Sequence, residues 1–258
     1  MNRLKKILKQ CFVATLAVAC VMPAIPAQAK TDKVLVIGNS MWNNGYSYNS
    51  LVKVAATAPK KHTIKLTKCL HDCYSLEKHY DKSGLGKLLK SEYDYVIIQE
   101  SSDGQTSTGK RFQQYRDNVY KIAKATEAKN SKVRIVLHSL HKSKNDTAKE
   151  YARKASNVKS IVSYIKKKNK NIDIVPMYEG KAFDYYKKHY NHYSLLGGDG
   201  HHPSPEGRYL EACCTYKAMY GKSPVGATYL AQHNYKNISK ARTKEIQKTV
   251  DAVKLTSD

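Results

Sequence analysis

The chain has 258 residues, of which 41% are hydrophobic, so it can bury one large α/β core or two small ones and is too apolar to be wholly disordered. Its formal net charge of +24 indicates attraction to anionic surfaces. The lysines are scattered along the whole chain, and no zinc-finger, helix-turn-helix or RNP pattern occurs, which argues against a specific nucleic-acid-binding module.

Residues 1–29 have the three parts of a secretory signal peptide. A basic start precedes the nearly all-apolar run 11–25, and the small residues of the AQA segment at 27–29 form a cleavage site. The run is short and two prolines interrupt it, which favours a cleaved leader over a transmembrane anchor. A lipoprotein at Cys20 fits less well, because apolar sequence continues beyond that cysteine. We therefore expect a secreted or cell-surface protein with no transmembrane anchor in the mature chain.

Apolar, β-rich runs alternate with helical stretches along the rest of the chain. The predicted strands cover residues 33–38, 62–68, 94–99, 133–139 and 172–177. The predicted helices cover residues 47–58, 85–91, 111–128, 146–168, 205–220 and 239–253. Such alternation predicts a parallel sheet with helices on both faces, and the second strand, which alternates more than the others, suits an edge. No repeat or linker divides the chain, so we expect a single domain over residues 30–258.

The mature chain keeps four cysteines, namely Cys69, Cys73, Cys213 and Cys214. Export permits disulfides, and a long-range bridge between the two pairs is one option, although the sequence alone does not define the pairing. The cysteine spacing matches no standard zinc pattern, so we expect no metal site. Cleavage after Ala29 removes four basic residues and no acidic one, which lowers the formal net charge from +24 to +20.

Polar residues at the ends of the predicted strands are the first candidates for a site, because ligands of open parallel sheets bind at the carboxyl ends of the strands. Ser40 follows the first strand, where it could be a nucleophile or only a turn residue. Gln99 and Glu100 end the third strand, and the Gln99 amide is a candidate oxyanion donor. His138 ends the fourth strand and suits either a cleft or a structural hydrogen bond.

A loop near residue 200 can supply the remaining groups of a serine hydrolase site. A serine nucleophile needs a base, and a histidine base needs a carboxylate to orient it. Asp199 and His202 offer both from one loop. Pro203 keeps His202 extended, and the Ser-Pro pair at 204–205 starts a helix directly after it. His201 competes as the base, but it lies on the opposite side of an extended loop from His202.

Three segments together resemble the SGNH hydrolases, the GDSL-type esterases: VIGNS around Ser40, VIIQESS around Gln99 and DGHHPSPEG around His202. The resemblance spans most of residues 33–226 and is strongest with a bacterial branch that has a Gly-Asn-Ser nucleophile block. It implies a flavodoxin-like three-layer α/β/α sandwich with a central parallel sheet of about five strands. It also implies a serine ester hydrolase without cofactor or metal, with Ser40 as nucleophile, His202 as base and Asp199 as the acid that orients it.

The sequence departs from the family pattern around the oxyanion hole. Asn39 stands where an aspartate is usual, and Gln99 lies nearest the position of the usual asparagine donor. HDCYSLEKH (71–79) resembles another family block, with Cys73 where a glycine is expected. The resemblance therefore implies oxyanion donors at the backbone N–H groups of Ser40 and Cys73 and at the Gln99 amide. Candidate substrate contacts flank these groups: Asn39, Trp42 and Glu100.

The function expected from these residues is a secreted serine esterase that removes O-acyl groups, O-acetyl groups in particular, from a carbohydrate. Two alternatives stay open. One is an acyltransferase that modifies wall polysaccharide with the same site. The other is a non-catalytic binding protein for anionic glycans, suggested by the positive charge and the altered oxyanion segments. The expected partners are an acylated carbohydrate or another small ester, with attraction to anionic polysaccharide or the cell surface and no specific nucleic acid.

Overall fold

The computed structural model describes residues 30–43, 47–230, 232–233 and 236–256. The expected signal peptide at residues 1–29 lies outside the described residues, so the leader and its cleavage stay predictions. Within the described ranges, no helix has both the length and the apolar character that a membrane crossing requires.

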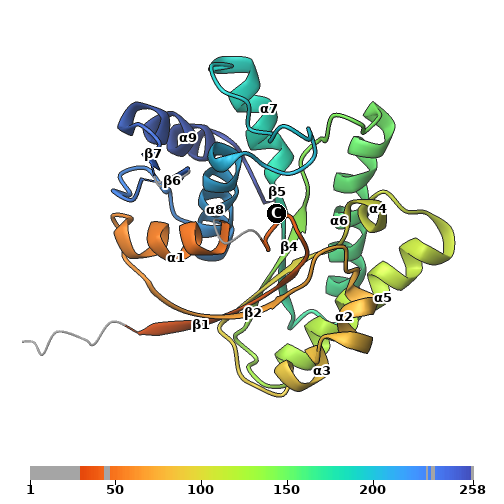
Figure 1. Cartoon of the computed structure of the whole chain (residues 1–258). Helices are drawn as coiled ribbons and strands as arrows, with labels where there is room; N and C mark the ends of the chain where they lie inside the picture. Colours follow the sequence, from red (N-terminus) through yellow and green to blue (C-terminus); the bar gives the residue numbers. More distant parts are fainter. Residues whose placement is uncertain (1–29, 44–46, 231, 234–235, 257–258) are drawn as a thin grey trace, which may run out of the picture.

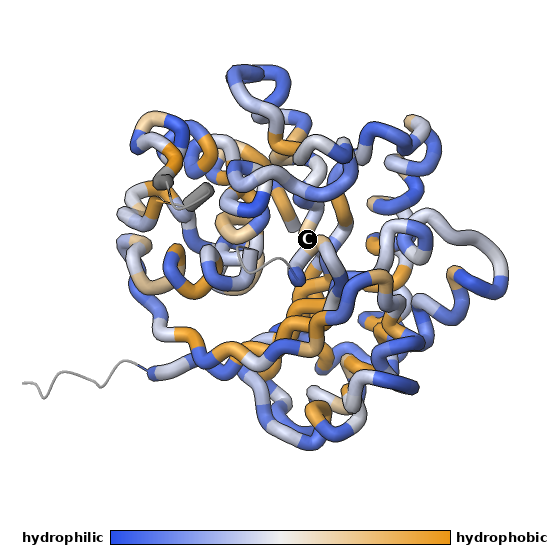
Figure 2. The backbone as a smooth tube through the Cα atoms, in the orientation of Figure 1, coloured by the Kyte–Doolittle hydropathy of each residue, from blue (hydrophilic) through white to orange (hydrophobic). Residues whose placement is uncertain are grey.

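Five parallel strands form the central sheet (Figure 1). They are β1 (Thr31–Gly38), β2 (Thr63–Leu70), β3 (Tyr95–Gln99), β4 (Arg134–Ser139) and β5 (Asp173–Tyr178), in the order β2-β1-β3-β4-β5. This is the flavodoxin-like order, and β2 lies at an edge as predicted. A sheet covered on both faces needs near-continuous apolar strands, and Figure 2 shows the central strands as the most hydrophobic part of the tube. Each predicted strand matches an observed one to within two residues at either end.

Helices cover both faces of the sheet, which makes a three-layer α/β/α sandwich (Figure 1). One face carries α1 (Ser47–Thr57), α7 (Glu179–His189), α8 (Pro205–Tyr220) and α9 (Lys240–Ala252). The other carries α2 (Leu76–Lys82), α3 (Leu85–Leu88), α5 (Gly109–Glu127) and α6 (Ala148–Lys168). The smaller elements are α4 (Ser102–Gln105), which follows β3, and a hairpin of β6 (Gln232–His233) and β7 (Lys236–Asn237).

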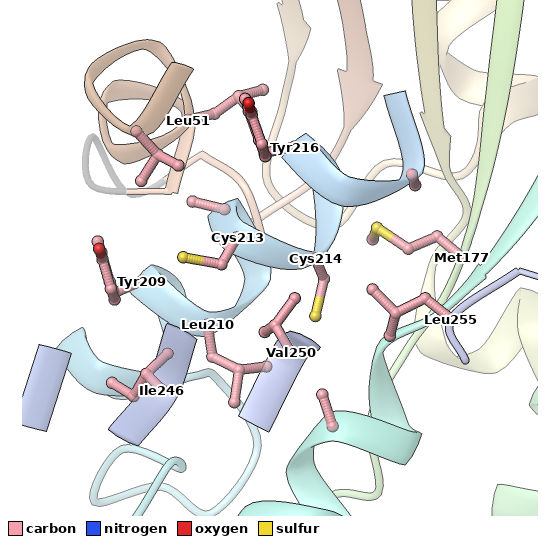
Figure 3. Packing of buried hydrophobic residues seen from close by; sticks show 14 of the residues in the cluster. Leu51, Met177, Tyr209, Leu210, Cys213, Cys214, Tyr216, Ile246, Val250 and Leu255 are labelled. Atoms are coloured by element: carbon pink, nitrogen blue, oxygen red, sulfur yellow. The ribbon is translucent and has the colours of Figure 1, made fainter. Parts of the chain in front are cut away.

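Helix α8 is buried on nearly all sides because it packs against the sheet, α1 and α9. Cys213 and Cys214 project from α8 into this apolar cluster (Figure 3). Cys69 belongs to the cluster on the opposite face of the sheet, and Cys73 is exposed. All four cysteines are free, so the long-range bridge that export would permit is absent from the described part of the chain. The sheet itself separates Cys69 from the two cysteines of α8.

Helices α2, α4 and α7 were not predicted, and one helix was predicted too long. The helix expected at 85–91 is only the four-residue α3, and α2 precedes it with Ser75 as its N-cap. Helix α7 begins at Glu179 directly after β5, and its N-cap residue makes no side-chain capping bond. Without a capping residue or a loop, the sequence carries no local signal for the start of α7.

Candidate active site

Ser40 lies in a tight turn directly after β1, at the carboxyl edge of the sheet. The backbone N–H groups of Trp42 and Asn43 both donate to the Asn39 carbonyl, at 2.9 and 2.8 Å, which closes the turn around the serine. The Asn39 N–H donates to the Gln99 Oε1 at 3.0 Å and so ties the turn to the end of β3. Strands β1 and β3 are neighbours at the point where the strand order reverses, which is where open α/β sheets bind their ligands.

His202 and Asp199 lie in a compact loop before α8. The Gly197 N–H donates to the His202 carbonyl at 2.8 Å, so the loop closes on itself. Asp199 Oδ1 accepts the backbone N–H groups of His201 and His202, at 2.9 and 3.0 Å. These two bonds fix the carboxylate relative to the histidine, as expected for an aspartate that bonds the backbone a few residues further on.

The start of α8 places the His202 ring beside Ser40. Ser204 caps the helix by accepting the Gly207 N–H at 3.2 Å, and Pro205 occupies the first turn. A Cβ atom on Gly207 would lie 2.1 Å from the Leu195 carbonyl oxygen, so only glycine lets the helix approach the loop this closely. Because α8 also packs against α1, the loop before α8 comes to lie beside the turn before α1.

The structure brings Ser40, His202 and Asp199 into one chain of hydrogen bonds. Ser40 Oγ lies 2.9 Å from His202 Nε2, and His202 Nδ1 lies 2.6 Å from Asp199 Oδ2. The hydrogen bonds from His202 and from the His201 backbone hold the pKa of Asp199 well below its ordinary value. Asp199 is therefore a carboxylate that accepts the Nδ1 proton, and Nε2 is free to accept the serine proton.

His201, the competing base, points elsewhere. Its ring meets that of His202 edge-on, with the ring centroids 4.9 Å apart. Burial and the neighbouring charge of His202 lower the pKa of His201. Its carbonyl oxygen accepts the Nε2 of His141 at 3.0 Å, so His201 is anchored to the protein interior through its backbone.

The segment predicted to contain an oxyanion donor lies against the turn around Ser40. Asn39 Nδ2 donates to the Tyr74 carbonyl at 3.3 Å, and Asn43 Nδ2 donates to Asp72 Oδ1 at 2.9 Å. Between these two contacts, Cys73 has a φ of 60°, in the left-handed region that favours glycine. Cys73 therefore adopts the type of backbone expected of the glycine that the resemblance places there.

Four residues predicted to contact substrate or the oxyanion are buried and have other partners. The exposed fractions are 0% for Trp42, 5% for Asn39, 3% for Glu100 and 1% for Gln99. Glu100 accepts the Leu76 and Ser101 N–H groups, and the Gln99 amide nitrogen donates to the Glu100 carbonyl. The predicted contacts with substrate or oxyanion are therefore corrected. The side chains of Gln99, Glu100 and Asn39 form hydrogen bonds that hold the loops together. The buried ring of Trp42 cannot form a wall of an open pocket.

Beneath the site lies a set of buried polar side chains that sequence reasoning missed, apart from His138. His138, Glu179 and Glu211 offer ligand atoms within 4.8 Å of one another, close enough to surround a cation. The donor set does not suit one. The Trp42 Nε1–H donates to His138 Nδ1 at 3.2 Å, so Nε2 carries the ring hydrogen and has no free lone pair for a metal.

No family model and no curated protein matches the sequence. Solved structures match the fold. A DUF4886 family protein from Bacteroides uniformis is 18% identical, with 86% of this chain and 93% of that chain covered and a TM-score of 0.61. A catalytic mutant of Axe2, an acetylxylan esterase from Geobacillus stearothermophilus, is 12% identical, with coverages of 75% and 97% and a TM-score of 0.56. A member of the lipolytic G-D-S-L family from Veillonella parvula is 11% identical, with coverages of 73% and 97% and a TM-score of 0.53.

These neighbours include an acetylxylan esterase and a member of the lipolytic G-D-S-L family. The chain therefore has an SGNH-hydrolase-like fold, as the three sequence segments predicted. At these identities the likeness concerns the fold, and the chemistry has to be argued from the residues of this chain.

Proposed function

We propose that the chain is a serine ester hydrolase. The observation that carries the proposal is the hydrogen-bonded series Ser40–His202–Asp199 at the carboxyl edge of the sheet. His202 accepts the proton of Ser40 as its Oγ attacks the ester carbonyl, and Asp199 stabilises the imidazolium that forms. His202 then returns the proton to the leaving alcohol, and water releases the acyl group from Ser40 by the reverse sequence.

The negative charge that develops on the carbonyl oxygen needs donors, and two backbone groups are proposed. The Ser40 N–H is carried by the nucleophile itself, and the Cys73 N–H lies in the segment that Asn39 and Asn43 tie to the nucleophile turn. The left-handed backbone at Cys73 supports this role, because such a conformation reorients the local N–H groups. The Gln99 side chain is not part of the proposed oxyanion hole.

The proposed substrate is a short O-acyl ester, in particular an O-acetyl ester, of a carbohydrate. Among the described residues, Tyr193 at 40% is the single large hydrophobic side chain classed as exposed, which does not suit a surface for long acyl chains. The predicted mature charge of +20 suits a polymer or cell surface that bears anionic groups. The acetylxylan esterase that shares the fold acts on an ester of this class. Secretion, proposed from residues 1–29, would bring the enzyme to such a polymer.

The proposal is tested by hydrolysis of a short-chain aryl acetate and by fluorophosphonate labelling with mapping of the modified residue. Ser40→Ala is expected to lower kcat by about 10⁴-fold or more and to abolish labelling. Ser156→Ala, which removes an exposed serine of α6, is the matched control and should behave as wild type. Equal rates for wild type and Ser40→Ala would overturn the proposal.

Two other functions are outcomes of the same work. Acyl transfer to an added sugar acceptor, detected by product analysis, would make the chain an acyltransferase that uses the same serine. Salt-sensitive retention on an acidic polysaccharide, without labelling of Ser40, would make it a glycan-binding protein.

A further inference from the structure

The two loops that meet at the active site are also joined below it by a chain of buried polar groups. The chain starts at Trp42, whose backbone N–H closes the turn around Ser40. The indole Nε1 of Trp42 donates to His138 Nδ1 at 3.2 Å, and His138 Nε2 lies 2.8 Å from Glu179 Oε2. Trp42 and His138 are both fully buried, so this side of the nucleophile turn is held from within the protein.

Glu179 is the centre of the chain, and each of its carboxylate oxygens lies close to a histidine ring, Oε1 in a hydrogen bond and Oε2 in an ion-pair contact. Oε2 faces His138, while Oε1 lies 2.6 Å from His141 Nδ1 and accepts the His141 backbone N–H at 3.1 Å. Burial alone would raise the pKa of Glu179, but the contacts with His138 and His141 outweigh it and hold that pKa below its ordinary value. Glu179 is the first residue of α7, directly after β5, so its backbone is fixed by the sheet.

The other end of the chain reaches the loop of the catalytic base. His141 Nε2 lies 3.0 Å from the carbonyl oxygen of His201, the residue just before His202. The His201 carbonyl can only accept, so His141 Nε2 is the donor of this contact. A second contact supports the same loop, because the Lys144 N–H donates to the Gly200 carbonyl at 2.7 Å.

We propose that Glu179 is a positioning residue that sets the distance between Ser40 and His202. Through His138 and Trp42 it holds the nucleophile turn, and through His141 and the His201 carbonyl it holds the loop of the base. This inference rests on the proposed function, since a fixed distance matters only if Ser40 and His202 react together. Glu179 touches no substrate in this scheme and acts only through the two histidines.

The chemistry of the two contacts explains why a carboxylate is needed at this position. His138 presents its Nε2–H and His141 presents its backbone N–H to residue 179, so both require an acceptor. A glutamine has one acceptor oxygen, and its NH₂ group would face one of the two histidine donors. In Glu179→Gln one of the two loops would therefore lose its contact with residue 179, although the volume of the side chain is unchanged. A displacement on the order of 1 Å at a reacting pair can lower the rate about 100-fold.

The test compares Glu179→Gln with wild type in kcat, KM and the rate of fluorophosphonate labelling at Ser40. We expect kcat and the labelling rate to fall together by about 100-fold while KM stays within about twofold, because no substrate contact is removed. Asp173→Asn is the matched control. It removes a cross-strand contact between the same two strands, from Arg134 Nε to Asp173 Oδ2 at 2.8 Å, at the opposite edge of the sheet. Its kcat should stay within about twofold of wild type.

A second variant keeps the proposal testable if Glu179→Gln does not fold. Trp42→Phe keeps a buried ring but removes the indole N–H that donates to His138. It should lower kcat with little change in KM. In a folded double variant with Glu179→Gln, the Trp42→Phe substitution should lower kcat much less than it does in wild type, because the Glu179→Gln substitution has already broken the chain of contacts. Wild-type kcat in Trp42→Phe, or fully additive losses in the double variant, would overturn the proposal. So would wild-type kcat in Glu179→Gln, or the same loss of kcat in Asp173→Asn.

Failure of the proposed function gives a different result. If the wild-type protein neither hydrolyses the aryl acetate nor labels at Ser40, the serine hydrolase function fails, and the positioning role fails with it. If wild type labels and Ser40→Ala does not, the function stands, and the variants of Glu179 and Trp42 decide the positioning role alone.

Discussion

A side-chain pair lies near each end of strands β4 and β5, and the two pairs differ sharply in their exposure to solvent. At the amino edge Arg134 Nε lies 2.8 Å from Asp173 Oδ2, with exposed side-chain fractions of 38% and 43%. At the carboxyl edge His138 Nε2 lies 2.8 Å from Glu179 Oε2, with exposed fractions of 0% and 1%. The contact distance is the same at both edges, but solvent reaches only the pair at the amino edge.

The comparison shows that a buried polar pair, unlike an exposed one, needs further hydrogen-bond partners from the protein. At the amino edge water completes the hydrogen bonding of both groups, so the pair needs no further partner. At the carboxyl edge each remaining nitrogen and oxygen needs a protein partner, because an unsatisfied buried polar group costs about 1–3 kcal/mol. Those partners are Trp42 for His138 and His141 for Glu179, and both lie on or beside the segments that form the site. The polar groups of the interior therefore extend to the catalytic loops.

The largest loss of activity is expected at the carboxyl edge, where His202 is the proposed base for Ser40. His202→Asn removes the base and should lower kcat/KM by about 10⁴-fold. His201→Asn should stay within about tenfold of wild type, because the carbonyl through which His201 joins the buried chain is kept. Steady-state kinetics on the aryl acetate measure both variants. A loss in His201→Asn as large as that in His202→Asn would make His201 the base.

The next effect concerns Glu211, the second buried glutamate at this edge. Its Oε2 accepts the Ser47 hydroxyl at 2.8 Å. Burial and then the charge of Glu179 raise the pKa of Glu211 well above its ordinary value. Above the unfolded pKa of about 4.3, folding must therefore bind a proton at Glu211, and stability falls as pH rises until the folded pKa is reached.

Glu211→Gln removes this proton uptake while keeping the shape of the side chain. Above about pH 5, the free energy of unfolding of wild type should fall relative to the variant by up to about 1.4 kcal/mol per pH unit. Urea unfolding at several pH values measures the difference. A constant difference between pH 5 and pH 8 would mean that Glu211 is ionised in the folded protein.

The sheet and the groups of the proposed catalytic site could be predicted from the sequence because each has a local signal. The buried strands are continuous apolar runs, and their alternation with helices fixes a parallel sheet. The loop before α8 contains Asp199, His202 and a proline-serine-proline sequence. In the structure Asp199 contacts His202, and Ser204 and Pro205 start α8.

The chain around Glu179 has no such signal. Its links join residues far apart in the sequence, such as Trp42 with His138 and His141 with His201, and only tertiary packing buries them. Trp42 was predicted to line the substrate pocket because it follows Ser40 by two residues, yet the turn directs its ring inward. Glu179 directly follows β5, so a stricter inspection of strand ends would have singled it out.

The last prediction concerns the stability that the pairs at the two edges contribute, and the smaller loss is expected at the amino edge. Asp173→Asn removes a pair whose members are both more than one-third exposed, and such pairs contribute about 0–1 kcal/mol to stability. Glu179→Gln leaves histidine donors buried without a full set of acceptors, and breaking a buried pair in this way costs about 3–5 kcal/mol. The two variants should also respond differently to salt. In 1 M salt the Debye length is about 3 Å, so exposed charges are screened, whereas buried charges are screened much less. Urea unfolding in low salt and in 1 M NaCl should therefore show a small loss for Asp173→Asn that vanishes with salt, and a larger loss for Glu179→Gln that persists. Similar losses in both variants, with the same response to salt, would mean that burial at the carboxyl edge does not distinguish the two pairs.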